Sequence, residues 1–564
     1  MKWRITFLIF GFGVFYFCLS FYLYNIQINK NGEYIRIAQM QTAAGGVLDA
    51  PRGSIFFTDK NNNQIPVAMN KSFSVIYAVP DEIQKSLASS TDSVGAISEK
   101  LSVIIGKTSA DIEKQLLKKN DQYELLLQKA DDEIVSRIQA LGVKGVYVVS
   151  KTLRYYPTLD LAAHLLGFVS PANDKESTKY GNAEIGRYGI ELSFNDTLSG
   201  KPGEVDGDNL IEPSQGGDVR LTIDRNIQSQ AEDILKNLIS QYNSPGGTVI
   251  VEEPSTGKIL AMGNYPDFDP NSYSKYEIKN FLNPATQAVY EPGSVFKILT
   301  MAAGIDSGKI TPSTTYYDVG SFTANNMTIS NWDFKTHGPY GRVTMTNVIE
   351  HSINTGAVFA ERKTGNDIFR NYVAKFGLGD LTGIELPGEV RGNQNNLKKG
   401  KDIDFATASY GQGVSVTPIA LISAVSAIAN NGVLMKPCIS YGAKPVVVRR
   451  VISEDTSRAV RKMMVLAVEK NVLADIPNYS VAGKTGTAFV PNFGGKGYTE
   501  KVINTYVGFA PAFDPKFVIL IKLNEPEGNP LAGQTVVPAF KDLAQYLLNY
   551  YNIPPDQLVQ NSGQ

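Results

Sequence analysis

The sequence predicts an α/β protein of the α+β type, with two or three domains behind one membrane-spanning helix. The chain has 564 residues, whereas a single hydrophobic core stops growing at roughly 250 to 300 residues. Residues 5–24 form an unbroken apolar run. In the second half of the chain, strand-like segments come early and late with helical segments between them. This order favours one sheet whose edges come from both ends of a domain.

The N-terminal apolar run reads ITFLIFGFGVFYFCLSFYLY over residues 5–24. At about 1.5 Å rise per residue, this length spans roughly the 30 Å of a bilayer core. Because Lys2 and Arg4 precede the run, the positive-inside rule puts the tail 1–4 in the cytoplasm and the rest of the chain outside the cell membrane. A cleaved signal peptide, with Ala43-Ala44 as its cleavage region, is the rival interpretation, but the run exceeds a typical signal core.

Composition argues against several classes of partner. The chain carries 54 Lys and Arg against 55 Asp and Glu, and has no long basic block that could follow a phosphate backbone. Nucleic acid is therefore not an expected partner. Cys18 and Cys438 lie far apart and cannot form a disulfide framework. Since the histidines and cysteines lack ligand spacing, neither a metal nor another cofactor is expected.

The region from residue 25 to 215 mixes strand-like and helix-like segments. Residues 72–79 alternate with a period of two, as in a strand. Residues 82–140 place apolar side chains at helical spacing, which indicates exposed amphipathic helices rather than a catalytic core. Glycines over 199–217 indicate a linker and a domain boundary. We therefore expect a non-catalytic domain over residues 25–215.

A second domain is predicted over residues 216–553. Strands are expected at residues 219–223, 247–251, 258–263, 480–490, 503–510 and 517–523, the second and third forming a hairpin. A helix is expected to start close to Ser294, because Glu291-Pro292-Gly293 supplies a turn before an apolar segment. A closing amphipathic helix is expected at 536–551, followed by a flexible tail at 554–564.

A serine followed three residues later by a lysine is the first candidate for chemistry. A serine hydroxyl is a poor nucleophile unless a base takes its proton, and a lysine three residues on along a helix lies on the same face. The pattern occurs as Ser255/Lys258, Ser272/Lys275 and Ser294/Lys297. An isolated match is more often a surface serine near a solvated lysine, so this pattern alone does not choose among the three.

Two further patterns discriminate among these serines. S-x-N occurs as Ser193/Asn195 and Ser352/Asn354, and K-T-G occurs as Lys363-Thr364-Gly365 and Lys484-Thr485-Gly486. Lys363 follows a helix-like segment with Gly365 at its expected C-cap, whereas the glycines around Lys484 allow a substrate backbone to approach a strand edge. The first S-x-N precedes every S-x-x-K. One ordered set remains: Ser294/Lys297, Ser352/Asn354 and Lys484-Thr485-Gly486-Thr487.

This trio is the signature of penicillin-binding proteins and class A β-lactamases. The chain resembles that family in YEPGSVFK (290–297), SINTG (352–356), YGQG (410–413) with Thr417-Pro418, and KTGTA (484–488). It resembles the pedestal domain of class B, monofunctional penicillin-binding proteins in PRGSI (51–55), RYYP (154–157), HLLGF (164–168) and GIE (189–191). Within that class it is most similar to the division-specific, FtsI-like branch. Val295 and Ile353 depart from the Thr and Ser that this branch often has.

The resemblance implies an elongated mixed α+β pedestal behind a retained anchor. It also implies a serine β-lactamase-like catalytic domain with a central antiparallel sheet flanked by helices. Ser294 would attack the D-Ala-D-Ala carbonyl of a peptidoglycan stem peptide, with Lys297 as the base. A second cation, Lys484, in a desolvated cleft would lower the pKa of Lys297. An amine of a neighbouring stem peptide would then resolve the acyl-enzyme, with carboxypeptidation as a side activity.

The resemblance also implies roles for the remaining motif residues. Ser352 would pass a proton to the departing D-Ala, and Asn354 would hold the donor peptide. The segment Lys484-Thr485-Gly486-Thr487 would bind the terminal carboxylate. Backbone N–H groups of Ser294 and Thr487 would form the oxyanion hole, an effect worth about 3 kcal/mol per donor.

The implied partners are peptidoglycan stem peptides, β-lactam antibiotics, the lipid bilayer, a membrane glycosyltransferase and other division proteins. The alternatives are an elongation-specific transpeptidase and a non-catalytic division scaffold or β-lactam sensor. A Ser-His-Asp hydrolase is disfavoured, because His164, His337 and His351 are accompanied by no G-x-S-x-G elbow. A β-lactamase would have no use for the pedestal and anchor.

Overall fold

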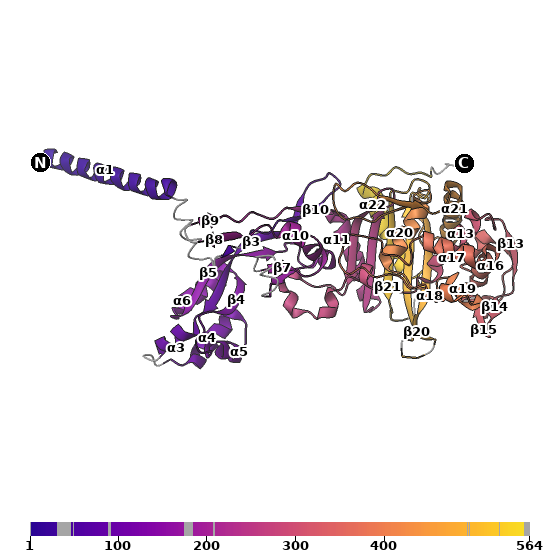
Figure 1. Cartoon of the computed structure of the whole chain (residues 1–564), viewed down its shortest axis with the longest axis horizontal. Coiled ribbons are helices and arrows are strands. Elements are labelled where there is room, and N and C mark those ends of the chain that lie inside the picture. Colours follow the sequence, from indigo (N-terminus) through magenta and orange to yellow (C-terminus); the bar gives the residue numbers. More distant parts are fainter. Residues whose placement is uncertain are drawn as a thin grey trace, which may run out of the picture. The chain divides into compact units, whose positions relative to one another are not determined.

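The computed structural model describes residues 2–30, 47–48, 50–87, 92–173, 184–206, 209–492, 494–495, 497–528 and 531–557. The predicted cleavage region at Ala43-Ala44 and the end of the predicted tail, 558–564, lie outside these ranges. The chain divides into two compact units, residues 68–157 and the combination of 1–67 with 158–564. Figure 1 labels the elements of both.

The N-terminal apolar run is helical, as predicted. Helix α1 (Lys2–Tyr24) continues into a π-helical turn, η1 (Asn25–Asn29). The most apolar 18-residue stretch within Trp3–Asn29 has a mean hydropathy of 2.0, and none of it is buried. It is therefore long and apolar enough to cross a membrane, and its orientation stays a prediction.

The unit of residues 68–157 is a small sheet covered by helices. Its strands are β3 (Ile65–Ala78), β4 (Glu124–Ala130) and β5 (Val146–Tyr155). Its helices are α3 (Pro80–Leu87), α4 (Val94–Ile105), α5 (Ser109–Leu116) and α6 (Asp132–Leu141). Strand β3 pairs antiparallel with both β4 and β5, which confirms the strand predicted at 72–79.

The prediction of helices throughout residues 82–140 is wrong at one place. Strand β4 interrupts them, and its alternating burial suits a strand paired on one edge with β3. The helices are amphipathic, as predicted. Leu101 of α4 and Leu116 of α5 are fully buried in the core that the helices form with the sheet.

Outside the unit of residues 68–157, several short elements precede the large domain in the chain. Its elements are β1 (Val47–Leu48), β2 (Ile55–Thr58), α7 (Ala163–Leu166), β6 (Val169–Pro171), β7 (Glu184–Gly186), α9 (Gly189–Ser193), α10 (Asn195–Leu198), β8 (Gly203–Asp206) and β9 (Asn209–Ile211). Strand β8 pairs antiparallel with both β1 and β9.

The glycines over 199–217 are not a free linker, contrary to prediction. A Cβ on Gly216 would lie 1.8 Å from the carbonyl oxygen of Leu198, and a Cβ on Gly53 would lie 2.1 Å from that of Gly217. These glycines therefore allow backbones to pack closely, which is the other use of glycine besides flexibility. The predicted domain limit near residue 215 stays a prediction.

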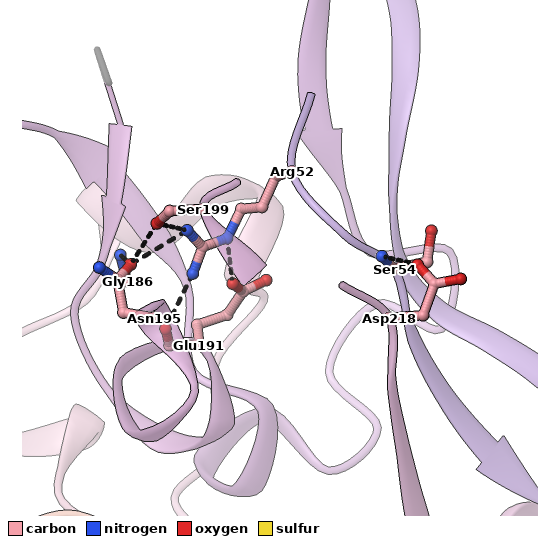
Figure 2. Close-up of polar contacts among 7 residues, drawn as sticks. All are labelled: Arg52, Ser54, Gly186, Glu191, Asn195, Ser199 and Asp218. Atoms are coloured by element: carbon pink, nitrogen blue, oxygen red, sulfur yellow. Dashed lines mark hydrogen bonds and ion pairs between the residues drawn. The ribbon is translucent and has the colours of Figure 1, made fainter. Parts of the chain in front are cut away.

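A buried arginine holds these segments together (Figure 2). Arg52 Nε donates to Glu191 Oε2 at 2.7 Å, and Nη2 donates to the Glu191 carbonyl at 2.8 Å. Its Nη1 donates to Asn195 Oδ1 and Ser199 Oγ, both at 3.0 Å. The arginine side chain is 8% exposed and that of Glu191 is 0% exposed. We call these four residues the Arg52 cluster.

The large domain is built on a five-stranded antiparallel sheet of order β12-β11-β21-β20-β19. Its strands are β11 (Gly246–Glu253), β12 (Lys258–Tyr265), β19 (Ala482–Pro491), β20 (Tyr498–Ala510) and β21 (Phe517–Asn524), and β10 (Val219–Asp224) pairs in parallel with β2. The β11–β12 hairpin and all six predicted strands are confirmed. So is the prediction that the two edges come from opposite ends of the domain.

Helices cover both faces of this sheet. Helices α11 (Arg225–Gln241) and α22 (Val536–Tyr550) pack with alternate residues such as Val249 and Val251 in one core. Glu252, which follows Val251, points to the opposite face, where it accepts a hydrogen bond from Ser423 Oγ of α20 (Pro418–Ala429) at 3.3 Å. The expected sheet flanked by helices is therefore confirmed.

The remaining elements of the large domain lie between β12 and β19 in the chain, and Figure 1 shows α16, α17, α19 and the β14–β15 hairpin gathered at one end of the domain. The helices are η3 (Pro270–Lys275), η4 (Ile278–Phe281), α12 (Pro284–Gln287), η5 (Gly293–Phe296), α13 (Lys297–Asp306), α14 (Phe334–His337), α15 (Met345–Glu350), α16 (Asn354–Thr364), α17 (Asn366–Lys375), α18 (Asn395–Lys399), α19 (Asp402–Ala408) and α21 (Glu454–Asn471). The strands are β13 (Thr315–Asp318), β14 (Ser321–Ala324), β15 (Met327–Ser330), β16 (Gly341–Thr344), β17 (Val433–Met435) and β18 (Val447–Arg450).

Candidate active site

Ser294 and Lys297 lie where a 3₁₀ turn becomes an α-helix. Ser294 is in η5, and Lys297 is the first residue of α13, which confirms the predicted helix start. Side chains three residues apart nearly eclipse in a 3₁₀ turn, so both leave the same side of it. Gly293 has φ +56°, and a Cβ there would lie 3.1 Å from the carbonyl oxygen of Thr487. The glycine lets the turn sit against the K-T-G strand.

Ser352 and Asn354 lie in the short connection between α15 and α16. Ser352 has φ +57°, a left-handed conformation that costs a non-glycine residue about 1 to 2 kcal/mol. Such residues persist where the surrounding structure over-determines them, and they gather at functional sites. Asn354 begins α16, and its Nδ2 donates to the carbonyl oxygen of Ser330 at 2.9 Å. Its Oδ1 is thereby turned the other way.

Lys484, Thr485, Gly486 and Thr487 lie on β19, the edge strand of the sheet. Among the described strands, only β20 pairs with β19, so the opposite edge of β19 faces the turn that carries Ser294. A Cβ on Gly486 would lie 2.5 Å from the carbonyl oxygen of Pro292. Glycine is therefore required at this position for the strand to approach the turn.

The two lysine amines meet at one serine hydroxyl. Lys297 Nζ donates to Asn354 Oδ1 at 2.8 Å and to Ser352 Oγ at 3.2 Å, and it also bonds the Ser352 carbonyl oxygen. Lys484 Nζ lies 3.0 Å from the same Ser352 Oγ and 3.3 Å from Thr485 Oγ1. Among the residues that the structure describes, neither amine forms an ion pair with a carboxylate.

Both amines are driven toward the neutral form. The side chain of Lys297 is 0% exposed, and this burial, followed by the charge of Lys484, holds its pKa well below the ordinary value, although Asp333 acts in the opposite direction. Burial lowers the pKa of Lys484 to about 7. A lysine that can be neutral near physiological pH can accept a proton from a serine.

These residues line one large cavity of about 890 Å³. Ser294, Ser352, Asn354, Lys484, Thr485 and Thr487 all contribute to its wall. The side chains of Trp332 and Leu473, which also line it, are 60% and 52% exposed. The cavity has the size of a ligand site and combines an apolar wall with a few convergent polar groups. Among the described residues, no cluster of His, Cys, Asp and Glu suits a metal.

The residues of the rival S-x-x-K patterns, and Lys363 of the other K-T-G, either bond other partners or are exposed. Ser272 Oγ donates to Asp269 at 2.7 Å, and Lys258 pairs with Glu253 at 3.8 Å. Lys363 is exposed near the end of α16, whose C-cap is Gly365 with φ +87°, as predicted.

The S-x-N formed by Ser193 and Asn195 and two of the histidines have structural surroundings as well. Asn195 belongs to the Arg52 cluster, so its S-x-N lies outside the cavity. Burial lowers the pKa of His164 to about 4. His351 lines the cavity, and its ring packs on Tyr340 at 5.0 Å between centroids.

Two family models match the chain. The model of the penicillin binding protein transpeptidase domain matches residues 247–545, more than half of the chain. The chain belongs to the penicillin-binding protein transpeptidase family. The model of the penicillin-binding protein dimerisation domain matches residues 47–236. Both the transpeptidase domain and the pedestal expected from the resemblance are therefore confirmed as family assignments.

Relatives of this transpeptidase span nearly its full length. Stage V sporulation protein D of Bacillus subtilis is 31% identical over 84% of this chain and 75% of its own length. Peptidoglycan D,D-transpeptidase FtsI of Escherichia coli K12 is 26% identical over 99% of this chain and 93% of its own. The crystal structure of penicillin binding protein 3 from Mycobacterium tuberculosis, complexed with aztreonam, is 25% identical and covers 91% of this chain and 99% of its own, with a TM-score of 0.66.

Sequence reasoning missed the residues that hold Asn354 and Thr355 in place through hydrogen bonds. Ser330 holds Asn354 through its carbonyl oxygen, and the neighbouring Asn331 accepts a hydrogen bond from Thr355 N at 3.1 Å. Asp318 accepts one from Thr355 Oγ1 at 2.5 Å. Ser330, Asn331 and Asp318 are 24 to 37 residues away from their partners. Of these supporting residues, a motif search could have found only Thr355, because it directly follows Asn354.

Proposed function

We propose that the chain is a peptidoglycan D,D-transpeptidase that cross-links stem peptides through a Ser294 acyl-enzyme during septal wall synthesis. One observation carries this proposal. A fully buried lysine, Lys297, shares a turn with a cavity-lining serine, Ser294, and its hydrogen-bond partners among the described residues are all neutral. Burial and the neighbouring Lys484 favour the neutral amine, which can act as a general base.

Acylation follows from these positions. Lys297 takes the proton of Ser294, whose Oγ attacks the carbonyl carbon of the penultimate D-Ala. The backbone N–H groups of Ser294 and Thr487 stabilise the oxyanion. The bond to the terminal D-Ala nitrogen then breaks, and Ser352, which lies against both amines, passes a proton to that nitrogen. Ser294 keeps the acyl group as an ester.

Deacylation uses a second stem peptide. Its amine attacks the ester carbonyl, a new peptide bond forms as the ester bond to Ser294 Oγ breaks, and the proton that the amine loses is returned to Ser294. Water in place of the amine gives carboxypeptidation. Lys484, Thr485 and Thr487 bind the donor carboxylate, since they present an amine and two hydroxyls to the cavity from one strand.

Asn354 has two tasks in this proposal. Its Oδ1 orients Lys297, and its amide nitrogen carries two N–H donors. One of these donors bonds the carbonyl oxygen of Ser330, which leaves the second for the donor peptide.

The cellular setting is inferred from the relatives and from α1. Relatives named peptidoglycan D,D-transpeptidase FtsI support the activity. The resemblance to the division-specific branch leads us to place this activity in septal synthesis at the membrane, with a membrane glycosyltransferase and other division proteins as partners. Helix α1 would anchor the chain with its N-terminus in the cytoplasm. Depletion of the protein tests the role: filamentous cells support division, whereas round cells support the elongation alternative and overturn the septal proposal.

The enzymatic proposal is tested by covalent labelling of the full chain with fluorescent penicillin. Wild type should form a stable adduct, and Ser294→Ala should form none. Ser255→Ala and Ser272→Ala are matched controls, because each removes the serine of a rival S-x-x-K, and both should label like wild type. Absence of label on wild type, or full label on Ser294→Ala, would overturn the proposal.

A further inference from the structure

Asp318 is a fully buried carboxylate outside all three motifs, at the end of β13. It accepts hydrogen bonds from Thr355 Oγ1 at 2.5 Å, Tyr340 N at 2.8 Å, Asn331 Nδ2 at 3.1 Å and Tyr316 OH at 3.3 Å. Burial opposes ionisation, but these bonds outweigh it and hold the pKa of Asp318 below its ordinary value. The side chain is therefore charged at neutral pH.

One of these donors is next to Asn354 of the S-x-N motif in the chain, and another is next to the residue that Asn354 bonds. Thr355 follows Asn354 in α16, and Asn331 follows Ser330, whose carbonyl oxygen accepts from Asn354 Nδ2 at 2.9 Å. Asn331 Oδ1 also accepts from Thr355 N at 3.1 Å. Two consecutive residues, the last of β15 (Ser330) and the next one (Asn331), thus hold two consecutive residues of α16, and Asp318 bonds one member of each pair.

The charge on Asp318 fixes the direction of these bonds. An ionised carboxylate can only accept, so the Asn331 amide must turn its Nδ2 toward Asp318 and its Oδ1 toward Thr355 N. With Thr355 fixed, the first turn of α16 is fixed too. Asn354 then keeps its Nδ2 on Ser330 and presents its Oδ1 to Lys297 Nζ at 2.8 Å.

We propose that Asp318 is a positioning residue for the transpeptidase reaction. Through Asn331 and Thr355 it holds the connection between α15 and α16, and therefore places Ser352 and Asn354 against Lys297. Ser352 needs such support, because its left-handed backbone is unfavourable in isolation. This inference rests on the proposed function of the Ser294 site and adds a residue that touches neither substrate nor Ser294.

The test is the rate of acylation of Asp318→Asn by fluorescent penicillin in the full chain. The amide would put N–H donors against the donors of Thr355, Asn331 and Tyr340. Because a displacement of about 1 Å can cost about 100-fold in rate, the limiting acylation rate constant should fall about 10- to 100-fold. The fraction of protein finally labelled and the penicillin concentration at half-maximal rate should stay nearly constant. A merely destabilising change would lower the labelled fraction instead.

Two further variants keep the test decisive if Asp318→Asn does not fold. Thr355→Val removes the hydroxyl that bonds Asp318 and should show the same loss of limiting rate, whereas Thr355→Ser keeps the hydroxyl and should restore it. Glu252→Gln is the matched control, since it also replaces a fully buried carboxyl but on the face of the sheet toward α20. It should acylate like wild type.

The outcomes separate the two proposals. Wild-type limiting rates in Asp318→Asn and Thr355→Val, or an equal loss in Glu252→Gln, would overturn the positioning role while the labelling of wild type upholds the Ser294 mechanism. Failure of wild type to label would overturn that mechanism itself.

Discussion

Two buried cationic sites in this protein have opposite surroundings. In the Arg52 cluster, the guanidinium meets the carboxylate of Glu191 and the oxygens of Asn195 and Ser199, so its charge is compensated (Figure 2). In the catalytic cavity, Lys297 and Lys484 share the hydroxyl of one serine, and neither forms an ion pair with a described carboxylate.

The partner of a buried cation, rather than burial alone, therefore decides whether the group keeps its charge. A paired, fully hydrogen-bonded charge stays a charge and fixes the segments that it joins. An unpaired amine in the same low-dielectric interior is pushed toward its neutral form and becomes available as a base. Arginine suits the first task because it does not lose its proton, and lysine suits the second because its pKa shifts readily.

The largest expected effect comes from exchanging these two residue types. Lys297→Arg replaces the amine with a permanently charged guanidinium that cannot act as a neutral base, so the acylation rate should fall by about 10²- to 10⁴-fold. Stopped-flow labelling with fluorescent penicillin measures this rate. Lys363→Arg, in the exposed K-T-G, is the matched control and should react at the wild-type rate. A Lys297→Arg variant that acylates normally would exclude Lys297 as the base.

The next effect concerns the Arg52 cluster. Arg52→Met should lower the free energy of unfolding by about 3 to 5 kcal/mol, because it leaves the Glu191 carboxylate buried without a partner. Thermal unfolding of the full chain in detergent reports the loss. Folded Arg52→Met should still acylate at the wild-type rate, and a large loss of acylation rate would mean that the two sites are not separate in function.

The two buried sites should differ in how pH changes the free energy of unfolding. The pKa of Lys484 is about 7 in the folded chain, below its unfolded value of roughly 10.4. Between these pH values the unfolded chain binds more protons, so the free energy of unfolding should rise with pH, by about 1.4 kcal/mol per pH unit for this group. Below pH 7 both states are protonated and this contribution is flat.

Denaturation at pH 7.5 and pH 9.5 measures that slope. Lys484→Met should remove the contribution of this lysine, whereas Arg52→Met should leave the slope unchanged. An identical slope in Lys484→Met and wild type would show that Lys484 is not the group responsible.

The smallest effect is expected where a charge pair is exposed. Arg458 and Glu454 lie 3.2 Å apart on α21 with side chains that are 64% and 56% exposed. Arg458→Gln should change the free energy of unfolding by less than about 0.5 kcal/mol. Chemical denaturation alongside Arg52→Met checks this, and similar losses in the two variants would contradict the role given to burial.

The sequence carried the strands, the hairpin and the motif order, because local patterns encode them. The S-x-x-K turn and the edge strand with Lys484 lie where those patterns predicted. Strand β4 was missed, since its seven residues lie among stronger helical signals. The glycines over 199–217 were misinterpreted, because a glycine signal does not distinguish flexibility from close backbone packing.

Asp318 was beyond sequence reasoning for a different reason. Its partners Asn331 and Thr355 are 13 and 37 residues away, and nothing in its local sequence marks a buried carboxylate. Similarly, the burial of Lys297 under Ser352 and Asn354 is a tertiary fact that the motif spacing alone does not contain.

The most direct test of the central claim is to locate the covalent penicillin adduct on the full chain by digestion and mass spectrometry. We propose that Lys297 and Lys484 activate Ser294, and we therefore expect a single adduct, on the peptide that contains Ser294. An adduct on Ser255, Ser272 or Ser352, or no adduct at all, would contradict it.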